Sequence, residues 1–351
     1  MKILGIESSC DDTSVALIEI DEKNLEVLAE KTASQIEIHA KYGGVIPEVA
    51  GRKHAEFITP VIEEVLKNQE KPDAIAVTFG PGLITGLLVG VEAAKTLSYI
   101  WDIPLIPVNH IEGHFYSPEI SKIEADRKKI EYPALALIVS GGHTELALSK
   151  KEGMYEKIGG TRDDAVGECF DKVAKLLGIP YPGGPKISKL AENGDENKIE
   201  FPRPMHDSHD LDMSFSGLKT AVLYWLKDHP ITIDNPIFKH NENIWTIEDV
   251  CASVQNAITD VLITKTTHAL ETHKPKTLIL AGGVSANKKL RDELEVLSKK
   301  MDIAFRLPEL TYTTDNAAMI AVAGYHRFQA GKIMDWKDIV ADPQSTLYNQ
   351  K

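Results

Sequence analysis

The feature that most constrains the fold is one strand–turn–strand pattern that occurs at two places in the chain. Residues 135–150 can be laid without gaps on residues 4–19, and both stretches consist of an apolar strand, a polar turn and a second strand. Identities that support the match include Ser9 with Ser140, Thr13 with Thr144, Ala16 with Ala147 and Leu17 with Leu148. A hairpin that opens each half predicts an internal duplication, with two similar lobes facing across a cleft. Chance similarity of two hairpins is the alternative.

The length agrees with two lobes. A chain of 351 residues exceeds the roughly 250–300 residues that a single hydrophobic core usually supports. We expect an N-terminal lobe of residues 1–130, completed by the C-terminal segment 325–351, and a second lobe of residues 131–324. The charged, apolar-poor stretch Glu119–Glu131 is the expected linker.

Composition restricts the compartment and the class of partner. The three cysteines are widely separated and form no C-x-x-C pair, which is typical of reduced thiols in a cytoplasmic protein. Polar residues begin by Glu7, too early for a signal peptide, and no apolar run is long enough to span a membrane. The formal charge of −13 argues against a broadly basic nucleic-acid binder, so nucleic acid would need a local basic patch or a partner's surface.

Two histidines four residues apart, His110 and His114, directly follow an apolar strand expected at Leu105–Val108. On a helix they share one face, with about 5–6 Å between their Cβ atoms, which is close enough for both imidazoles to bind one metal ion. Two histidines that merely share a helix face are the other interpretation. Asp315 precedes an apolar helix expected at 317–325, and it is either the N-cap of that helix or a third, oxygen ligand.

The two copies of the hairpin differ in the chemistry of their turns. Asp11 and Asp12 lie in the first turn, where they are either ordinary turn residues or carboxylates that serve as a general base or as magnesium ligands. Gly142 and His143 occupy the matching positions of the second turn. That turn therefore offers bare backbone N–H groups, which suit a phosphate.

Further loops suggest nucleotide binding. Tyr181–Pro185 is too rich in glycine and proline to be helix or strand, and Gly184 would let a ribose or base approach the backbone. Asn287 begins a helix after a strand and a Gly-Gly pair, a plausible place beside adenine or ribose. His54, with its basic neighbours 52 and 53, is either part of a solvated helix face or a contact to an anionic ligand. Residues 230–246 are expected to form an exposed insertion.

Together these loops resemble the bacterial tRNA N6-adenosine threonylcarbamoyltransferase family, once described as glycoproteases. The resemblance covers nearly the whole chain. It rests on Gly5–Asp11, Tyr42–Glu48, His110–His114, Val139–Thr144, Tyr181–Pro185, Asp212–Lys219, Ala281–Asn287 and Thr314–Asn316. It implies an α/β protein with the duplicated actin/hexokinase/Hsp70-like (ASKHA) fold, whose two lobes flank a cleft.

The resemblance also implies the site residues. A metal, usually assigned as iron(II) with zinc(II) as the alternative, would be held by His110, His114 and Asp315. Asp11 would be the acid/base residue. The site for threonylcarbamoyl-AMP would be lined by Ile138, Val139, Ser140, Gly141, Gly142, Asp171, Gly184 and Asn287. Asp12 departs from the family pattern, which usually has glutamate there, and this shortens the side chain by one methylene.

The activity implied is a metal-dependent acyl transfer that converts an adenosine of tRNA into t6A, with threonylcarbamoyl-AMP as the donor. The implied partners are tRNA, a paralogous non-catalytic ASKHA subunit and a P-loop ATPase, and Mg²⁺ with ATP or ADP is a further candidate ligand. A metalloprotease is one alternative, although Ile111 stands where a zincin has its glutamate. A nucleotide-binding assembly subunit without chemistry of its own is another.

Overall fold

The computed structural model describes residues 1–121 and 129–349, which form two compact units. Unit 1 contains residues 1–130, 151–156 and 307–351, and unit 2 contains residues 131–150 and 157–306. The chain thus returns to unit 1 at Leu307 rather than at the expected position 325, because the helix that follows packs on the sheet of unit 1. The middle of the expected linker, residues 122–128, lies outside the described residues.

Unit 1 is built on a five-stranded sheet with the strand order β3-β2-β1-β4-β5. Its strands are β1 (Lys2–Glu7), β2 (Asp12–Ile20), β3 (Leu25–Ser34), β4 (Ala74–Gly80) and β5 (Leu105–Asn109). Strands β1, β4 and β5 run parallel, whereas β2 is antiparallel to both β1 and β3. The carboxyl ends of the three parallel strands therefore meet at one edge of the sheet, where α/β proteins usually bind ligands.

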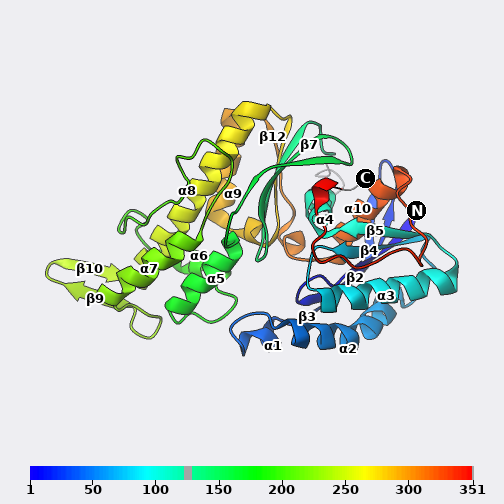
Figure 1. Ribbon diagram of the computed structural model, residues 1–351, viewed down its shortest axis with the longest axis horizontal. Coiled ribbons are helices and arrows are strands. Elements are labelled where there is room, and N and C mark those ends of the chain that lie inside the picture. Colours follow the sequence, from blue (N-terminus) through cyan, green and yellow to red (C-terminus); the bar gives the residue numbers. More distant parts are fainter. Residues whose placement is uncertain (122–128, 350–351) are drawn as a thin grey trace. The chain divides into compact units, whose positions relative to one another are not determined.

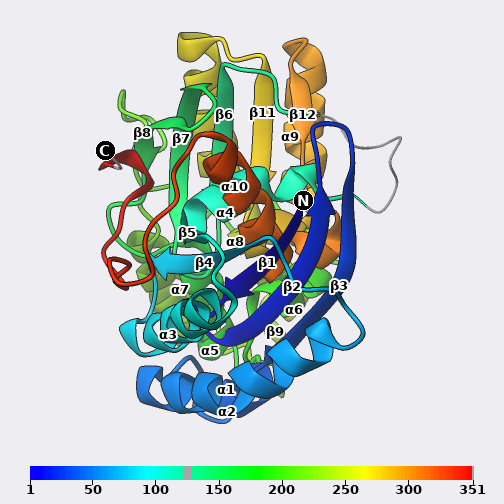
Figure 2. The same cartoon turned by 90° about the vertical axis from the view of Figure 1, so that its right-hand side faces the viewer.

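Helices cover both faces of this sheet (Figures 1 and 2). Its helices are α1 (Ile36–Ala40), α2 (Pro47–Leu66), α3 (Ile84–Trp101), α4 (His110–Tyr116) and α10 (Ala317–Gln329). Leu4 and Ile6 pack in the core beneath α2 and α3, whereas Gly5, between them, faces α10. Successive strand side chains point to opposite faces, so α10 lies on the other face. A Cβ atom at Gly5 would collide with the carbonyl oxygen of Ala317, so glycine permits the close approach of α10 to β1.

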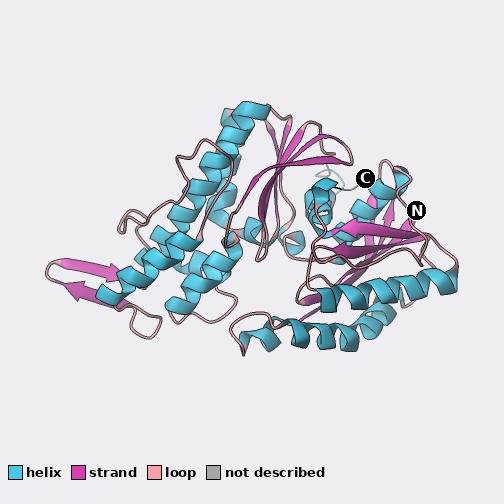
Figure 3. Cartoon of the chain, in the orientation of Figure 1, coloured by secondary structure: helices cyan, strands magenta, loops and turns pink. Residues whose placement is uncertain are grey.

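Unit 2 repeats the same sheet with the order β8-β7-β6-β11-β12. Its strands are β6 (Ala134–Val139), β7 (Thr144–Lys151), β8 (Met154–Gly160), β11 (Thr277–Ala281) and β12 (Ala304–Arg306), with residues 151–156 belonging to unit 1. Its helices are α5 (Val166–Leu176), α6 (Gly184–Ala191), α7 (Ser216–Asp228), α8 (Ile247–His273) and α9 (Lys288–Lys300). Figure 3 shows these helices in cyan and the strands in magenta. The helices and the strands of the sheet share one large hydrophobic core.

The predicted duplication is confirmed down to strand register. Leu4 pairs with Leu17 between β1 and β2, and the matching residues Leu135 and Leu148 pair between β6 and β7. In each unit a third strand extends this hairpin, and two further strands continue the sheet on its other side, parallel to the first strand. Chance similarity of two hairpins would not reproduce a whole five-stranded topology.

Two local expectations need comment. The loop Tyr181–Pro185 was expected to be free of helix, but α6 begins at Gly184, and Pro185 occupies its first turn, where a missing backbone N–H costs nothing. The stretch 230–246 forms a two-stranded hairpin of β9 (Ile237–His240) and β10 (Asn243–Thr246), whose side chains are mostly exposed. No helix in the described residues is long and apolar enough to cross a membrane.

Candidate metal centre

Helix α4 carries the two histidines at the carboxyl end of β5. Strand β5 is fully buried, and its last residue, Asn109, caps the helix by accepting a hydrogen bond from the backbone N–H of Ile111 at 2.9 Å. His110 and His114 follow one helical turn apart, with ring centroids separated by 4.7 Å. Both side chains are buried. The predicted shared face is confirmed, and it points into the unit rather than to solvent.

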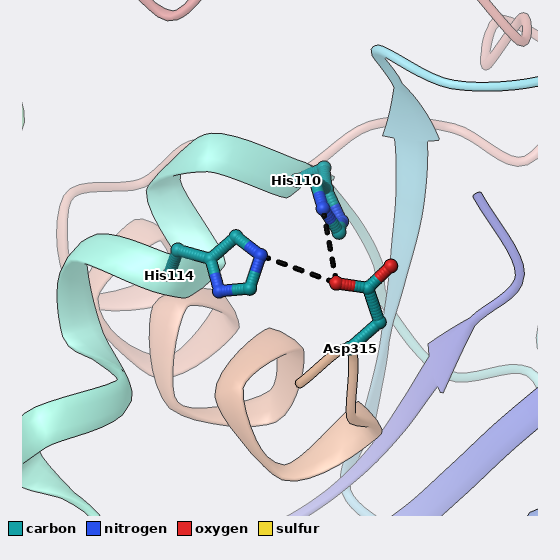
Figure 4. Close-up of side chains that lie close together, drawn as sticks. All are labelled: His110, His114 and Asp315. Carbon is teal, nitrogen blue, oxygen red and sulfur yellow. Dashed lines mark ion pairs between the residues drawn. The ribbon is translucent and has the colours of Figure 1, made fainter. Parts of the chain in front are cut away.

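Asp315 completes a cluster with the two imidazoles (Figure 4). Its Oδ1 atom lies 3.5 Å from Nε2 of His110 and 3.2 Å from Nε2 of His114. One ligand atom from each residue lies within 4.8 Å of the others. The N-cap interpretation of Asp315 is wrong, because Asn316 caps α10 by accepting the backbone N–H of Met319 at 2.9 Å.

The donor set fits a divalent transition metal. Both ring nitrogens of His114 are buried and make no hydrogen bond within the described residues, even though Asp315 is close. A buried polar atom without a partner costs about 1–3 kcal/mol, which an ion bound at Nε2 would remove. Two imidazoles and one carboxylate suit both zinc and non-haem iron. The residues therefore fit a metal, and they leave open which one.

The charges around the cluster are strongly coupled. Burial lowers the pKa of His110, but the carboxylates of Asp315 and Glu7 outweigh it and raise this pKa to about 9. Burial lowers the pKa of His114. The carboxylates therefore favour the charged form of His110, whereas burial favours the neutral form of His114, which is the form that binds a metal.

Asp11 and Asp12 lie at the turn from β1 into β2, in the same unit as the cluster. Burial raises the pKa of Asp11, with the charge of Asp315 acting in the same direction. Burial also raises the pKa of Asp12, to about 7, and its Oδ1 is a buried atom without a hydrogen bond in the described residues. A raised carboxylate pKa is compatible with the general-base interpretation of this turn, for Asp12 as well as for Asp11.

His54 belongs neither to a solvated face nor to an anion contact. Its ring is buried in α2, where Nδ1 lies 2.8 Å from the hydroxyl of Thr13 and Nε2 lies 3.0 Å from the carbonyl oxygen of Cys10. The neutral ring satisfies both contacts by donating from Nε2 and accepting at Nδ1. His54 therefore clamps both ends of the turn that carries Asp11 and Asp12. The solvated-face interpretation holds for the exposed Arg52 but is wrong for His54.

The end of β6 and the loop after it carry five of the residues expected to bind the adenylate. Ile138 and Val139 are buried at the end of the strand, and Ser140 closes the turn by accepting the backbone N–H of His143 at its hydroxyl, 3.1 Å away. Gly141 and Gly142 are exposed, and a Cβ atom on either would meet no atom within 4 Å. A ligand can therefore approach the backbone at these two glycines.

Asp171 and Gly184 meet where α5 lies beside α6. The carboxylate Oδ1 of Asp171 accepts the backbone N–H groups of Gly183 at 2.7 Å and of Gly184 at 3.3 Å, so it satisfies the first turn of α6. A Cβ atom on Gly184 would meet only the side chain of Phe170, at ordinary contact distance.

Asn287 is largely engaged within unit 2. Its Nδ2 donates to Ser188 Oγ and to Gln255 Oε1, both at 2.7 Å, and its Oδ1 accepts the backbone N–H of Leu290 as the cap of α9. The side chain thus joins α6, α8 and α9. Its predicted contact with adenine or ribose stays a prediction, since such a contact would have to use the remaining acceptor capacity of Oδ1.

The predicted site residues fall into two groups. His110, His114, Asp315 and Asp11 belong to unit 1, whereas the expected adenylate-binding residues belong to unit 2. Sequence reasoning missed Glu7, whose carboxylate contacts His110, and it passed over Glu112 between the two histidines. A signal was present in both cases: Glu7 ends an apolar strand, and Glu112 is the carboxylate of the short helix that carries the two histidines.

A family model described as tRNA N6-adenosine threonylcarbamoyltransferase matches residues 26–322. Relatives with this name include a Bacillus cereus protein, 48% identical over 94% of this chain and 92% of its own length. A Staphylococcus carnosus protein is 46% identical over 95% of this chain and 93% of its own length. The chain belongs to this family.

The chain also resembles solved structures in its fold. Full-length HypF in its phosphate- and nucleotide-bound form matches with a TM-score of 0.58 at 12% identity, over 93% of this chain and 46% of HypF. Component A of the Acidaminococcus fermentans (R)-2-hydroxyglutaryl-CoA dehydratase matches with a TM-score of 0.52 at 14% identity, over 95% of this chain and 100% of its own. The expected duplicated ASKHA fold is thereby confirmed.

A second set of charged side chains, of which Glu112 and Arg327 are buried, contacts α4. Glu112 accepts hydrogen bonds from Arg327 of α10 at 2.9 Å and from the hydroxyl of Tyr155 at 3.1 Å. His326, the neighbour of Arg327, lies between Glu119 and Glu152 and stacks on Tyr116 with ring centroids 4.1 Å apart. These contacts tie α4, which carries His110 and His114, to α10, which begins just after Asp315 and Asn316.

The histidine in this set predicts a pH dependence of stability. Burial lowers the pKa of His326, but Glu119 and Glu152 raise it from 6.5 to about 9. A pKa raised in the folded state adds stability that is complete below pH 6.5 and is lost as the pH rises to about 9. We therefore expect the difference in unfolding free energy between the wild type and His326→Gln to be largest near pH 6 and to vanish above about pH 9. Urea unfolding between pH 6 and pH 10 measures it, and a difference independent of pH would contradict it.

Proposed function

We propose that this chain transfers the threonylcarbamoyl group from threonylcarbamoyl-AMP to N6 of the adenosine that follows the anticodon on its 3′ side. The tRNAs would be those that read codons beginning with A, and the products would be t6A and AMP. The observation that carries the proposal is full-length membership of a family with this activity in its name, joined to a buried cluster of His110, His114 and Asp315.

The reaction is an acyl transfer in which one bond forms and one bond breaks at the carbamoyl carbon. The exocyclic amine of adenosine attacks the carbamoyl carbon, a new C–N bond forms, and the bond from that carbon to the phosphate oxygen breaks to release AMP. The amine loses one proton, which Asp11 accepts. Burial raises the pKa of Asp11 and so makes it a stronger base than an ordinary aspartate.

His110, His114 and Asp315 would hold one divalent metal ion, for which we propose iron(II), with zinc(II) as the alternative. Such an ion supplies Lewis-acid polarisation of a substrate oxygen. A metal site requires ligands that are held rigidly in place. Strand β5 and helices α4 and α10 are largely buried, and their packing would hold the three side chains in this way.

The residues of unit 2 would bind the adenylate. The exposed backbone at Gly141 and Gly142 suits a phosphate, since bare N–H groups form an anion-binding concavity. Ile138, Val139 and Ser140 place this loop, Asp171 and Gly184 lie at the start of α6, and Asn287 lies at the start of α9. Mg²⁺ with ATP or ADP is a further candidate for the same loops.

The acidic charge of the chain bears on its partners. At a formal charge of −13 the chain repels tRNA unless a basic surface elsewhere compensates. We therefore propose that it works with a paralogous non-catalytic ASKHA subunit and a P-loop ATPase, in the cytoplasm. On this proposal the isolated chain has weak activity or none.

The geometry of α4 disfavours the protease alternative. A zincin needs a glutamate directly after the first histidine to activate water. Ile111 occupies that position, and the carboxylate of Glu112 is buried and occupied by Arg327 and Tyr155. A non-catalytic assembly subunit would not need the buried cluster of His110, His114 and Asp315, so this alternative is also disfavoured.

Reconstitution of the reaction tests the proposed function. The chain, purified without oxygen and loaded with iron(II) or zinc(II), is mixed with tRNA, threonylcarbamoyl-AMP and its partner subunits, and t6A is measured by mass spectrometry of the digested tRNA. We expect t6A only with the complete mixture, and none on a tRNA that carries guanosine in place of the target adenosine. Full activity of the partners without this chain would contradict the proposal.

A further inference from the structure

Glu7 is a fully buried carboxylate at the carboxyl end of β1, in the core of unit 1. A buried charge is strongly unfavourable unless it is paired and hydrogen-bonded. Three donors surround it. Its Oε1 lies 2.6 Å from the backbone N–H of Ser9, and its Oε2 lies 2.6 Å from the hydroxyl of Thr78 and 3.0 Å from Nδ1 of His110.

These contacts determine which nitrogen of His110 carries the proton. An ionised carboxylate can only accept hydrogen bonds, so Nδ1 of His110 must donate to it. When the ring is neutral, the lone pair is therefore on Nε2. That atom is the one that faces Asp315, at 3.5 Å. The hydroxyl of Ser9, 3.1 Å from the same Nδ1, could not impose this choice, because a hydroxyl can donate as well as accept.

We propose that Glu7 is a positioning residue of the metal centre, which orients His110 and keeps its proton on Nδ1 so that Nε2 is the metal ligand. The inference rests on the proposed function, since it assumes that His110 binds the ion. A carboxylate hydrogen-bonded to the second nitrogen of a ligating histidine commonly fixes its tautomer and its orientation. Glu7 does not itself touch the ion or the substrate.

The substitution Glu7→Gln distinguishes control of the His110 tautomer from a role in packing alone. Glutamine has nearly the same shape, but its amide has one accepting oxygen and one donating nitrogen. If the oxygen keeps the bond from Ser9, the amide nitrogen faces His110, which favours the tautomer with Nδ1 accepting and the proton on Nε2. If the amide turns over, its oxygen faces Nδ1 but its nitrogen meets the N–H of Ser9, so two buried donors oppose each other. The first arrangement removes the lone pair from Nε2, and the second disturbs the side chain that orients His110.

Thr78→Val is the matched control. It removes a donor to the same Oε2 atom and keeps the shape of the side chain, but it leaves the carboxylate beside His110. A general loosening of the buried pocket would weaken the site in both variants. A tautomer effect weakens it only in Glu7→Gln.

The experiment measures Zn²⁺ binding by competition with a chromogenic chelator on the purified full chain, counting only the binding that Asp315→Ala removes. We expect Glu7→Gln to bind Zn²⁺ roughly 10–100-fold more weakly than the wild type, in the range for such supporting residues, and Thr78→Val to stay near the wild type. Equal affinity of Glu7→Gln and the wild type, or equal loss in both variants, would overturn the inference.

A second measurement does not depend on how well the variant folds. In the wild type loaded with Zn²⁺ and labelled with ¹⁵N-histidine, long-range ¹H–¹⁵N spectra should show His110 protonated at Nδ1 and metal-bound at Nε2. Coordination through Nδ1 would refute the role of Glu7 while leaving the metal centre in place. A wild type without specific Zn²⁺ binding would refute the metal centre itself, and the inference with it.

Discussion

Asp315→Ala is expected to reduce t6A formation by roughly a thousandfold, because a metal centre supplies several kcal/mol and each 1.4 kcal/mol is about tenfold in rate. The change removes the only oxygen ligand of the cluster His110, His114 and Asp315 that the described residues form. It also removes a charge that raises the pKa of His110. The fold should persist, since Asn316 rather than Asp315 caps α10.

Two measurements check this expectation, the rate of t6A formation in the reconstituted mixture and the metal content after purification. Asp338→Ala is a suitable control, because Asp338 is an exposed aspartate in the same C-terminal segment. Both quantities should fall in Asp315→Ala and neither in Asp338→Ala. Normal activity in a variant that no longer holds metal would refute the catalytic role of the metal.

Asp11→Asn should slow transfer by about 10²–10⁴-fold, the range for loss of a general base. Binding of the adenylate should be nearly unchanged, because the residues proposed to bind it lie in unit 2 while Asp11 lies in unit 1. Single-turnover transfer measures the first quantity, and calorimetric binding of a non-hydrolysable adenylate analogue measures the second.

The variant Asp12→Asn tests whether Asp12, rather than Asp11, accepts the proton. Burial raises the pKa of Asp12 to about 7, so Asp12 is the nearest competing base in the same turn. Slow transfer in Asp11→Asn with normal transfer in Asp12→Asn supports Asp11 as the proton acceptor. The reverse result would transfer that role to Asp12 and contradict our assignment.

The duplicated architecture could be predicted because each half repeats a local pattern. The match of residues 4–19 with residues 135–150 follows from alternating apolar residues and from polar turns, which depend on near neighbours in the chain. The structure confirms this match through the same cross-strand pairs in both sheets. The histidine pair was equally local, since residues four apart on a helix share a face.

Local sequence patterns did not predict which residue each buried polar side chain contacts. His54 looks like part of a basic stretch, yet it is buried and clamps the turn that carries Asp11. Asp315 looks like a helix cap, yet Asn316 is the cap. In both cases the decisive contact comes from a segment distant in the sequence, and no periodicity reports it.

The sequence by itself determined the strand order of each hairpin, the place of His110 and His114 on one helix face, and the family, because these depend on spacing along the chain. Spacing alone left the role of Asp315 open, and its place beside the histidines was expected only from the family resemblance. The tertiary structure brings Asp315 to the histidines and shows that Glu7 contacts His110. The close packing of α10 on β1, which Gly5 permits, brings the segment of Asp315 to the carboxyl ends of the parallel strands. Such convergence arises from packing across the sheet, which residues remote in sequence share only after folding.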